Sequence, residues 1–436
     1  MWLEFSVKRP SPRVLACLSL LVLIGIGFAE TNASGSSEQV PSVLIDTDMA
    51  PDDWMAILYL LQRPDVSVMA ITVTGAGETH CEPGVRHALG LVALAGGGDI
   101  PVACGRETPL QGSHTFPESW REAVDNLLGL SLPETAASPS KQTAVELLTS
   151  AMQSSPEKVV LVTLGPLTNV AEALQATPSL VNKLKMIYIM GGAVEVPGNI
   201  AVSGVGIDNK VAEWNIYVDP HAANIVFKSG APITLVPLDA TNHVPLTASF
   251  YKRIRDYHTS PEATFVFDLL TKNYGMIESG AYYFWDPLAA AISSDESLAT
   301  FQTMSLAVLE QEGPESGRIF RSSNAGTVRV AVSADGPRFE QIFLQTVNGQ
   351  LTLTASATPT TTAVATISRT QVSTTPPSVP STTATQEVLT TTRHTEEATV
   401  MPPPSLILIG IIVIVIAAVG VIAVLYRKKR GSVPDG

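Results

Sequence analysis

The sequence has few cysteines and no basic patch across most of its length. It contains three cysteines in 436 residues. Cys17 lies in an apolar N-terminal run, so Cys81 and Cys104 remain for the folded part, either as a disulfide or as buried free thiols. The net charge is -13, and no basic cluster precedes residue 427. These absences argue against nucleic acid as a partner. We also find no internal repeat.

The first segment has the pattern of a secretory signal. Basic residues within positions 8–13 precede an apolar run over 14–29, and polar residues follow. This order is typical of a signal peptide, here spanning residues 1–29 and cleaved after Ala29. The sequence therefore predicts that the remainder of the chain is exported.

A second apolar run lies near the other end of the chain. Residues 405–426 carry no charge, and the basic tail 427–436 follows at once. The run is about long enough to cross a bilayer, and basic clusters stay on the cytoplasmic side. The pattern predicts a single-pass helix in the cell membrane that leaves the main domain, residues 38–350, outside. Residues 351–404 are rich in Thr, Ser and Pro and are predicted to form an unfolded stalk.

Within residues 38–350, apolar strand-like runs alternate with helical stretches. Runs at 43–45, 68–74 and 159–164 are each followed by a helical pattern. Such alternation predicts an α/β domain of the doubly wound type with a mostly parallel sheet. In sheets of this kind, ligands bind beyond the carboxyl ends of the strands.

A dense acidic segment follows the first of these runs. Asp46, Asp48, Asp52 and Asp53 lie within eight positions, and Pro51 opens a helix whose first turn carries the last two. Carboxylates this close repel unless a cation or protons intervene, and oxygen ligands suit Ca²⁺ or Mg²⁺ rather than zinc. Helix capping alone explains Asp52 and Asp53 but not the other two. The segment therefore predicts a site for a hard cation.

The segment from Asp46 to Asp53 resembles the opening motif of the inosine-uridine preferring nucleoside hydrolase family, usually Asp-x-Asp-Pro-Gly-x-Asp-Asp. Later segments are similar, in the same order, to further motifs of that family: residues 164–169, 190–193, 213–223 and 285–287. The resemblance spans about residues 41–345. It implies the α/β fold of that family and a Ca²⁺-dependent hydrolysis of the N-glycosidic bond of ribonucleosides, which releases ribose and free base.

The resemblance also implies roles for particular residues. Asp48 would be the general base that acts on a water held by the cation. Together with Asp48, the protein ligands of the cation would be Asp53, Asp286 and the backbone carbonyl of Leu164. Asp46 would support these ligands from behind.

Substrate contacts are implied in the same way. The matching positions are Asp52, Glu78, Met190, Asn199, Glu213, Asn215 and Trp285. Carboxylates and amides bind vicinal hydroxyls through paired hydrogen bonds, which suits a ribose. Many family members have a histidine where this chain has Trp285, and a tryptophan there resembles the purine-specific branch, in which the base is stacked. If Glu78 is buried near the leaving group, its raised pKa would make it an acid.

Two other functions fit parts of the pattern. Aspartates after an apolar strand also resemble the nucleophile motif of haloacid-dehalogenase-type phosphatases, but that motif explains neither Asp52 and Asp53 nor the later segments. A surface protein that only captures nucleosides would use the same pocket without a general base, so Asp48 favours an enzyme. The sequence thus predicts a membrane-tethered N-ribohydrolase with a small ribonucleoside substrate. Family members are commonly oligomers, so a homo-oligomer is also expected.

Overall fold

The structure, a computed structural model, describes residues 40–352. The predicted signal peptide, transmembrane helix and basic tail lie outside the described residues, as does the predicted stalk from residue 353 onward. Within residues 40–352, no helix combines the length and the apolar character needed to span a bilayer.

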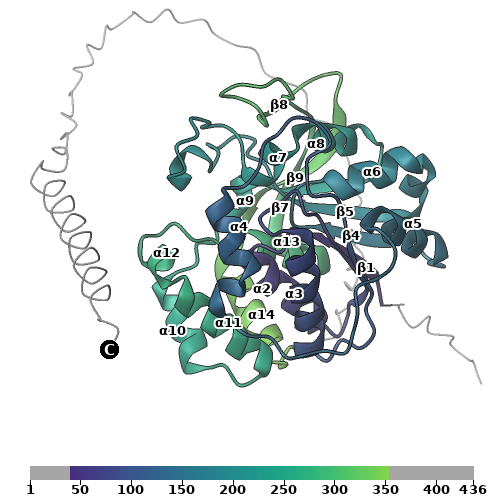
Figure 1. The fold of residues 1–436 in the computed structure, drawn as a ribbon. Coiled ribbons are helices and arrows are strands. Elements are labelled where there is room, and N and C mark those ends of the chain that lie inside the picture. The colour runs from purple at the N-terminus through teal and green to yellow at the C-terminus, as the bar shows by residue number, and fades with distance from the viewer. Residues whose placement is uncertain (1–39, 353–436) are drawn as a thin grey trace, which may run out of the picture. The chain divides into compact units, whose positions relative to one another are not determined.

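A single nine-stranded sheet runs through the described domain in the order β3-β2-β1-β4-β5-β6-β9-β7-β8 (Figure 1). The pairs from β3 to β9 are parallel, whereas β7 is antiparallel to both β9 and β8. The strands are β1 Ser42–Thr47, β2 Ser67–Val73, β3 Val102–Cys104, β4 Val159–Thr163, β5 Leu184–Met190, β6 Ile233–Val236, β7 Ala299–Val308, β8 Ile319–Arg321 and β9 Gly326–Ala334. The prediction of an α/β domain with a mostly parallel sheet is confirmed.

Helices cover both faces of the sheet (Figure 1). They are α2 Pro51–Leu61, α3 Cys81–Leu94, α4 Glu118–Asp125, α5 Ala144–Ser154, α6 Thr168–Ala176, α7 Trp214–Val218, α8 Pro220–Lys228, α9 Leu238–Thr241, α10 Ala248–Asp256, α11 Pro261–Lys272, α12 Tyr274–Glu278, α13 Trp285–Ser294 and α14 Gly336–Val347. Ile45 packs in one apolar cluster with α2, α3, α13 and α14, whereas its neighbour Leu44 packs in another with α5, α6 and α8. Successive side chains of a strand point to opposite faces, so β1 is buried from both sides.

The strand order changes direction at β1. From β1, the chain builds outward through β2 and β3 on one side and through β4, β5 and β6 on the other. The carboxyl ends of β1 and its two neighbours are aligned, because Asp46 is paired in register with Thr72 and with Thr163. Ligands of doubly wound sheets bind where the order reverses in this way. The acidic segment leaves β1 at that point.

The two cysteines that were left open by the sequence form a disulfide. Cys81 begins α3 and Cys104 ends β3, and their Cα atoms are 5.6 Å apart. This distance lies within the range usual for disulfides. The bond joins the start of α3 to the edge of the sheet, directly after the segment that connects β2 to α3.

Candidate active site

Asp46 lies behind the site rather than in it. It is fully buried, and its Oδ1 accepts hydrogen bonds from Thr72 Oγ1 at 2.6 Å and from Asn169 Nδ2 at 2.8 Å. Burial raises the pKa of Asp46 to about 7, although both hydrogen bonds act in the opposite direction. Its neighbours come from β2 and α6, so it ties the acidic segment to two other elements.

A sharp turn at Met49 joins β1 to α2. Its φ is 58°, in the left-handed region that residues other than glycine rarely adopt. The Met49 carbonyl accepts hydrogen bonds from Trp54 Nε1 at 2.8 Å and from Thr79 Oγ1 at 3.0 Å. These contacts hold the turn, so that α2 begins with Asp52 and Asp53 directed back toward the end of β1.

Three carboxylates meet at the start of two helices. Asp52 and Asp53 lie in the first turn of α2, and Asp286 lies in the first turn of α13. One oxygen from each lies within 4.8 Å of the others, and all three residues are buried. Burial, followed by the charges of neighbouring carboxylates, raises the pKa of Asp53 and Asp286 well above the usual range, and burial raises that of Asp52 to about 6. Helix N-termini favour anions, but repulsion within the group remains.

The donor atoms of this group fit a hard cation. Asp53 Oδ2 and Asp286 Oδ1 are buried and have no hydrogen-bond partner among the described residues. Buried polar atoms are rarely left unpaired, and Ca²⁺ or Mg²⁺ accepts several carboxylate oxygens. The group contains two of the predicted ligands, Asp53 and Asp286, together with Asp52, which was predicted to contact substrate. The predicted Leu164 carbonyl accepts a hydrogen bond from Asn215 Nδ2 at 3.0 Å and keeps a second lone pair.

Asp48 is held in place by close backbone contacts. It is 1% exposed, and its Oδ2 accepts a hydrogen bond from the Glu78 amide at 3.0 Å. A Cβ atom on Gly77 would lie 2.0 Å from Asp48 Cβ, and one on Gly165 would lie 2.8 Å from the Asp48 amide nitrogen. Only glycine permits these approaches. Burial, opposed by the Glu78 amide and reinforced by nearby carboxylates, raises the pKa of Asp48 to about 7, which suits a general base at neutral pH.

Sequence reasoning missed these two glycines as part of the site. Gly77 follows β2 and Gly165 follows β4, so each comes just after a strand that pairs with β1. A glycine in the loop that follows each of these strands was the available signal. It could not be interpreted without knowing which strands are neighbours.

Polar groups beyond β4 and β5 complete another side of the site. Glu213 caps α7, and its carboxylate accepts hydrogen bonds from the Asn215 amide at 2.9 Å and the Gly192 amide at 2.7 Å. Asn215 Nδ2 also donates to the Met190 carbonyl at 3.3 Å. Burial raises the pKa of Glu213 to about 7. Asn199 Oδ1 is buried without a hydrogen-bond partner among the described residues and is therefore available to a ligand.

These groups border a cavity of about 880 Å³. Every residue predicted to contact substrate lines it: Asp52, Glu78, Met190, Asn199, Glu213, Asn215 and Trp285. Among the predicted cation ligands, Asp48, Leu164 and Asp286 line it, whereas Asp53 and the supporting Asp46 do not. Burial, and then the charge of Asp48, raises the pKa of Glu78 well above its usual range. A more open cavity of about 660 Å³ beside Arg106 and Glu172 contains none of the predicted residues.

Aromatic side chains form much of the remaining wall. They are Phe116, Trp120, Trp214, Tyr282, Tyr283 and Trp285. Phe116 and Trp214 stack with ring centroids 4.9 Å apart, and Trp120 is tilted against Trp214 at 5.6 Å. Trp120 was missed by the sequence analysis because α4 is a short helix far along the chain from the recognised motifs. The cavity is thus lined by both carboxylates and aromatic rings, which suits a polar sugar joined to a flat ring.

Comparison with known proteins gives consistent matches. A family model described as inosine-uridine preferring nucleoside hydrolase matches residues 43–341. A pyrimidine-specific ribonucleoside hydrolase RihA from Citrobacter koseri is 39% identical over 228 residues, which cover 52% of this chain and 69% of that protein.

Solved structures match over a longer part of the chain. An inosine-uridine preferring nucleoside hydrolase from Bacillus anthracis has a TM-score of 0.63 at 25% identity and covers 71% of this chain and 99% of its own. A purine-preferring ribonucleoside hydrolase from Gardnerella vaginalis has a TM-score of 0.62 at 30% identity, with 71% and 98% covered.

Proposed function

Because the chain belongs to the inosine-uridine preferring nucleoside hydrolase family and is an N-ribohydrolase, we propose that it cleaves purine ribonucleosides to ribose and free base with Ca²⁺ as its cation. The observation that carries this proposal is the position of Asp48. A buried carboxylate with a pKa of about 7 lines the same cavity as Asp52, Asp286 and the sugar-side residues Asn199, Glu213 and Asn215. A capture protein has no need of such a base.

The cation is proposed from the donor set. Asp53 and Asp286 would hold it, with Asp48 and the Leu164 carbonyl as the further ligands that the resemblance implies, and the unpaired oxygens of Asp53 and Asp286 support this assignment. When bound, Ca²⁺ supplies a positive charge that lowers the pKa of a water and orients the hydroxyls of the ribose. It also relieves the repulsion among the buried carboxylates.

The residues of the chain would carry the other steps. Asp48 takes a proton from the water as the water oxygen bonds to the anomeric carbon of the ribose. The bond from that carbon to the base nitrogen breaks, and its electron pair leaves with the base. Buried carboxylates such as Glu213 support the positive charge that develops on the sugar. Glu78, which lines the cavity beside Asp48, is the proposed proton donor to the leaving base.

The preference for purines is supported by the aromatic wall. Trp285 lies 5.6 Å from Tyr282 and 5.7 Å from Tyr283, measured between ring centroids, and all three rings line the cavity. Stacking on aromatic rings favours the larger face of a purine. The names of the relatives include both a pyrimidine-specific and a purine-preferring enzyme. They support ribonucleosides as the substrate class. The preference for one nucleobase is therefore argued from the residues that line the cavity.

We also propose that the enzyme works outside the cell membrane, tethered by residues 405–426. The support is the sequence pattern alone: an apolar run with basic residues behind it, and a signal-like segment at 1–29. Recovery of the full-length protein in the membrane fraction, with its main domain open to added protease in intact cells, is the expected result. Recovery in the soluble fraction would contradict it. Light scattering of the purified protein tests the expected homo-oligomer.

The activity is tested by ribose release from inosine, guanosine, adenosine, uridine and cytidine. We expect release that stops on chelation of Ca²⁺, returns when Ca²⁺ is added back, and is lost in Asp48→Asn. A purine preference supports stacking, and a pyrimidine preference would refute it. Binding of a nucleoside without any cleavage would establish the capture function instead.

A further inference from the structure

The segment between β2 and α3 lies directly against Asp48. The Thr74 amide donates to the Thr47 carbonyl at 2.9 Å, and the Thr79 amide donates to the Asp48 carbonyl at 3.2 Å. Between these two anchors, the Glu78 amide donates to Asp48 Oδ2 at 3.0 Å. The orientation of the proposed base therefore depends on the conformation of residues 74–80.

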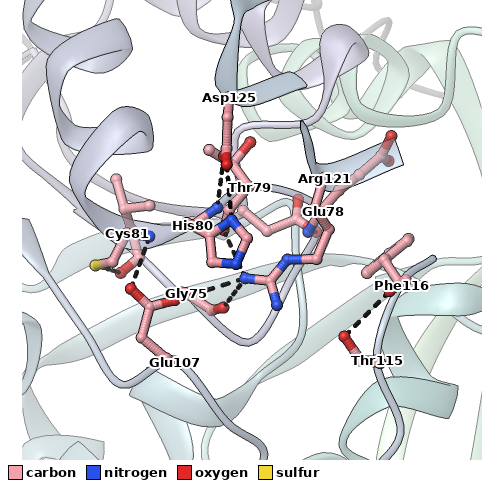
Figure 2. Close-up of polar contacts among 12 residues, drawn as sticks. Gly75, Glu78, Thr79, His80, Cys81, Glu107, Thr115, Phe116, Arg121 and Asp125 are labelled. Atoms are coloured by element: carbon pink, nitrogen blue, oxygen red, sulfur yellow. Dashed lines mark hydrogen bonds and ion pairs between the residues drawn. The ribbon is translucent and has the colours of Figure 1, made fainter. Parts of the chain in front are cut away.

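Helix α4 contacts the same segment through Arg121 and Asp125 (Figure 2). Arg121 is 6% exposed, and its Nη2 donates to the Gly75 carbonyl at 2.7 Å and to the Thr79 carbonyl at 3.4 Å. These two carbonyls stand on either side of Glu78. One guanidinium thus bridges both ends of the turn that presents the Glu78 amide.

Asp125 adds a second contact from the next turn of α4. Its Oδ1 accepts a hydrogen bond from the His80 amide at 2.9 Å, and its Oδ2 is bonded to His80 Nδ1 at 2.7 Å (Figure 2). Arg121 and Asp125 are four residues apart on a helix and so share one face. Together they hold the segment at Gly75, Thr79 and His80.

These hydrogen bonds explain why the Arg121 side chain is buried. Its nearest carboxylate oxygen, Glu107 Oε2, is 3.5 Å away, and the Glu107 side chain is 51% exposed. Burying a guanidinium is costly unless its donors are used, and an exposed carboxylate offsets little of that cost. Both hydrogen bonds come from Nη2, whose N–H groups have fixed directions in the guanidinium plane, whereas a lysine ammonium is a point charge on a flexible stem. The hydrogen bonds to the segment are the use that the structure provides.

We propose that Arg121, supported by Asp125, is a positioning residue that keeps the Glu78 amide bonded to the Asp48 carboxylate. The inference rests on the proposed function, because it assigns Asp48 the role of base. It also connects the cavity wall to the proposed general base, Asp48, because four residues of the same helix line the cavity: Ser119, Trp120, Ala123 and Val124. Loss of the guanidinium frees the segment and lets the Asp48 carboxylate rotate. The three clustered carboxylates (Asp52, Asp53 and Asp286) and the sugar-side residues (Asn199, Glu213 and Asn215) contact other elements and keep their places.

The test compares two equally buried arginines in the full-length protein at saturating Ca²⁺. Arg63 is also 6% exposed. It donates hydrogen bonds to Asp65 and Tyr59, neither of which lines the cavity. In Arg121→Met we expect kcat to fall on the order of 10–100-fold, as when groups that orient a catalytic ligand are removed, with KM changed by less than about threefold. Arg121→Lys should recover part of kcat, because an ammonium can reach one of the carbonyls. Arg63→Met should lower Tm and leave kcat per folded molecule unchanged.

Hydrogen–deuterium exchange tests the contacts of Arg121 and Asp125 with the segment without relying on catalysis. Peptides that cover residues 74–81 should exchange faster in Arg121→Met, Arg121→Lys and Asp125→Asn than in wild type, and at the wild-type rate in Arg63→Met. Unchanged exchange, or a kcat that falls only with the folded fraction, overturns the inference. A rise in KM at constant kcat also overturns it. A wild type that cleaves no nucleoside refutes the proposed function, and exchange then decides whether α4 holds the segment.

Discussion

Replacing Asp53 by asparagine is expected to stabilise the cation-free protein and abolish its response to Ca²⁺. Asp53 is fully buried, and burial together with the charges of Asp48 and Asp52 raises its pKa well above the usual range. Asparagine removes one of these charges and keeps an oxygen that can accept the hydrogen bond from the Thr47 hydroxyl. The residue that the cation requires is therefore one that the cation-free fold tolerates poorly.

The gain comes from removing the Asp53 charge. Burial is the largest cause of the raised pKa of Asp53, followed by the charge of Asp48, so ionising Asp53 at pH 7.5 costs free energy in the fold that is absent in the unfolded chain. Asparagine removes this cost. We expect Asp53→Asn to raise the free energy of unfolding by about 1–2 kcal/mol without Ca²⁺, or Tm by about 2–6 °C. Wild type should gain about 2.7 kcal/mol when Ca²⁺ is at 100 times its Kd.

The assay is thermal unfolding at pH 7.5 in chelator and across a Ca²⁺ series. The matched control is Asp219→Asn. Asp219 is equally buried, but its carboxylate accepts hydrogen bonds from the Leu110 amide at 2.7 Å and the Thr168 hydroxyl at 2.8 Å. Its variant should lose stability in both conditions and keep the Ca²⁺ response. If Asp53→Asn is destabilised in chelator, or is still stabilised by Ca²⁺ as wild type is, the reasoning about the carboxylate group is wrong.

Three further predictions concern other positions. Gly165→Ala should lower kcat about 100-fold, because the new Cβ would lie 2.7 Å from Asp48 Cβ. The control Gly275→Ala places its Cβ in open space and should keep wild-type kinetics. Equal kinetics for the two variants would contradict this prediction. Trp285→Ala should raise KM about tenfold more for inosine than for uridine, measured by ribose release, and an equal rise would exclude selective stacking. Burial lowers the pKa of His87 from 6.5 to about 4, so the unfolded chain takes up the proton first and stability falls as pH drops from 6.5 toward 4. Denaturant titrations of His87→Gln should show about 1–2 kcal/mol less of this loss at pH 5, and an unchanged pH profile would count against it.

The sequence by itself determined the features that lie within short segments. The apolar runs of β1, β2 and β4 were readable because buried parallel strands need continuous apolar residues on both faces. Pro51 marked the start of α2, since its fixed φ suits a first helical turn. The cation site could be anticipated because four acidic residues lie in one stretch, Asp46 to Asp53, whose charges need neutralising wherever it folds. The ordered motifs were sufficient to indicate the family.

Only the tertiary structure decided which distant groups meet. It placed Asp286, at the start of α13, beside Asp52 and Asp53 at the start of α2. It also brought Arg121 beneath the segment that orients Asp48. A period of apolar residues predicts which face of an element is buried, but it carries no information about which other backbone packs there. For that reason the glycines beside Asp48, the wall formed by α4 and the pairing of Cys81 with Cys104 required the fold: each depends on an approach of a few ångströms between segments far apart in the chain.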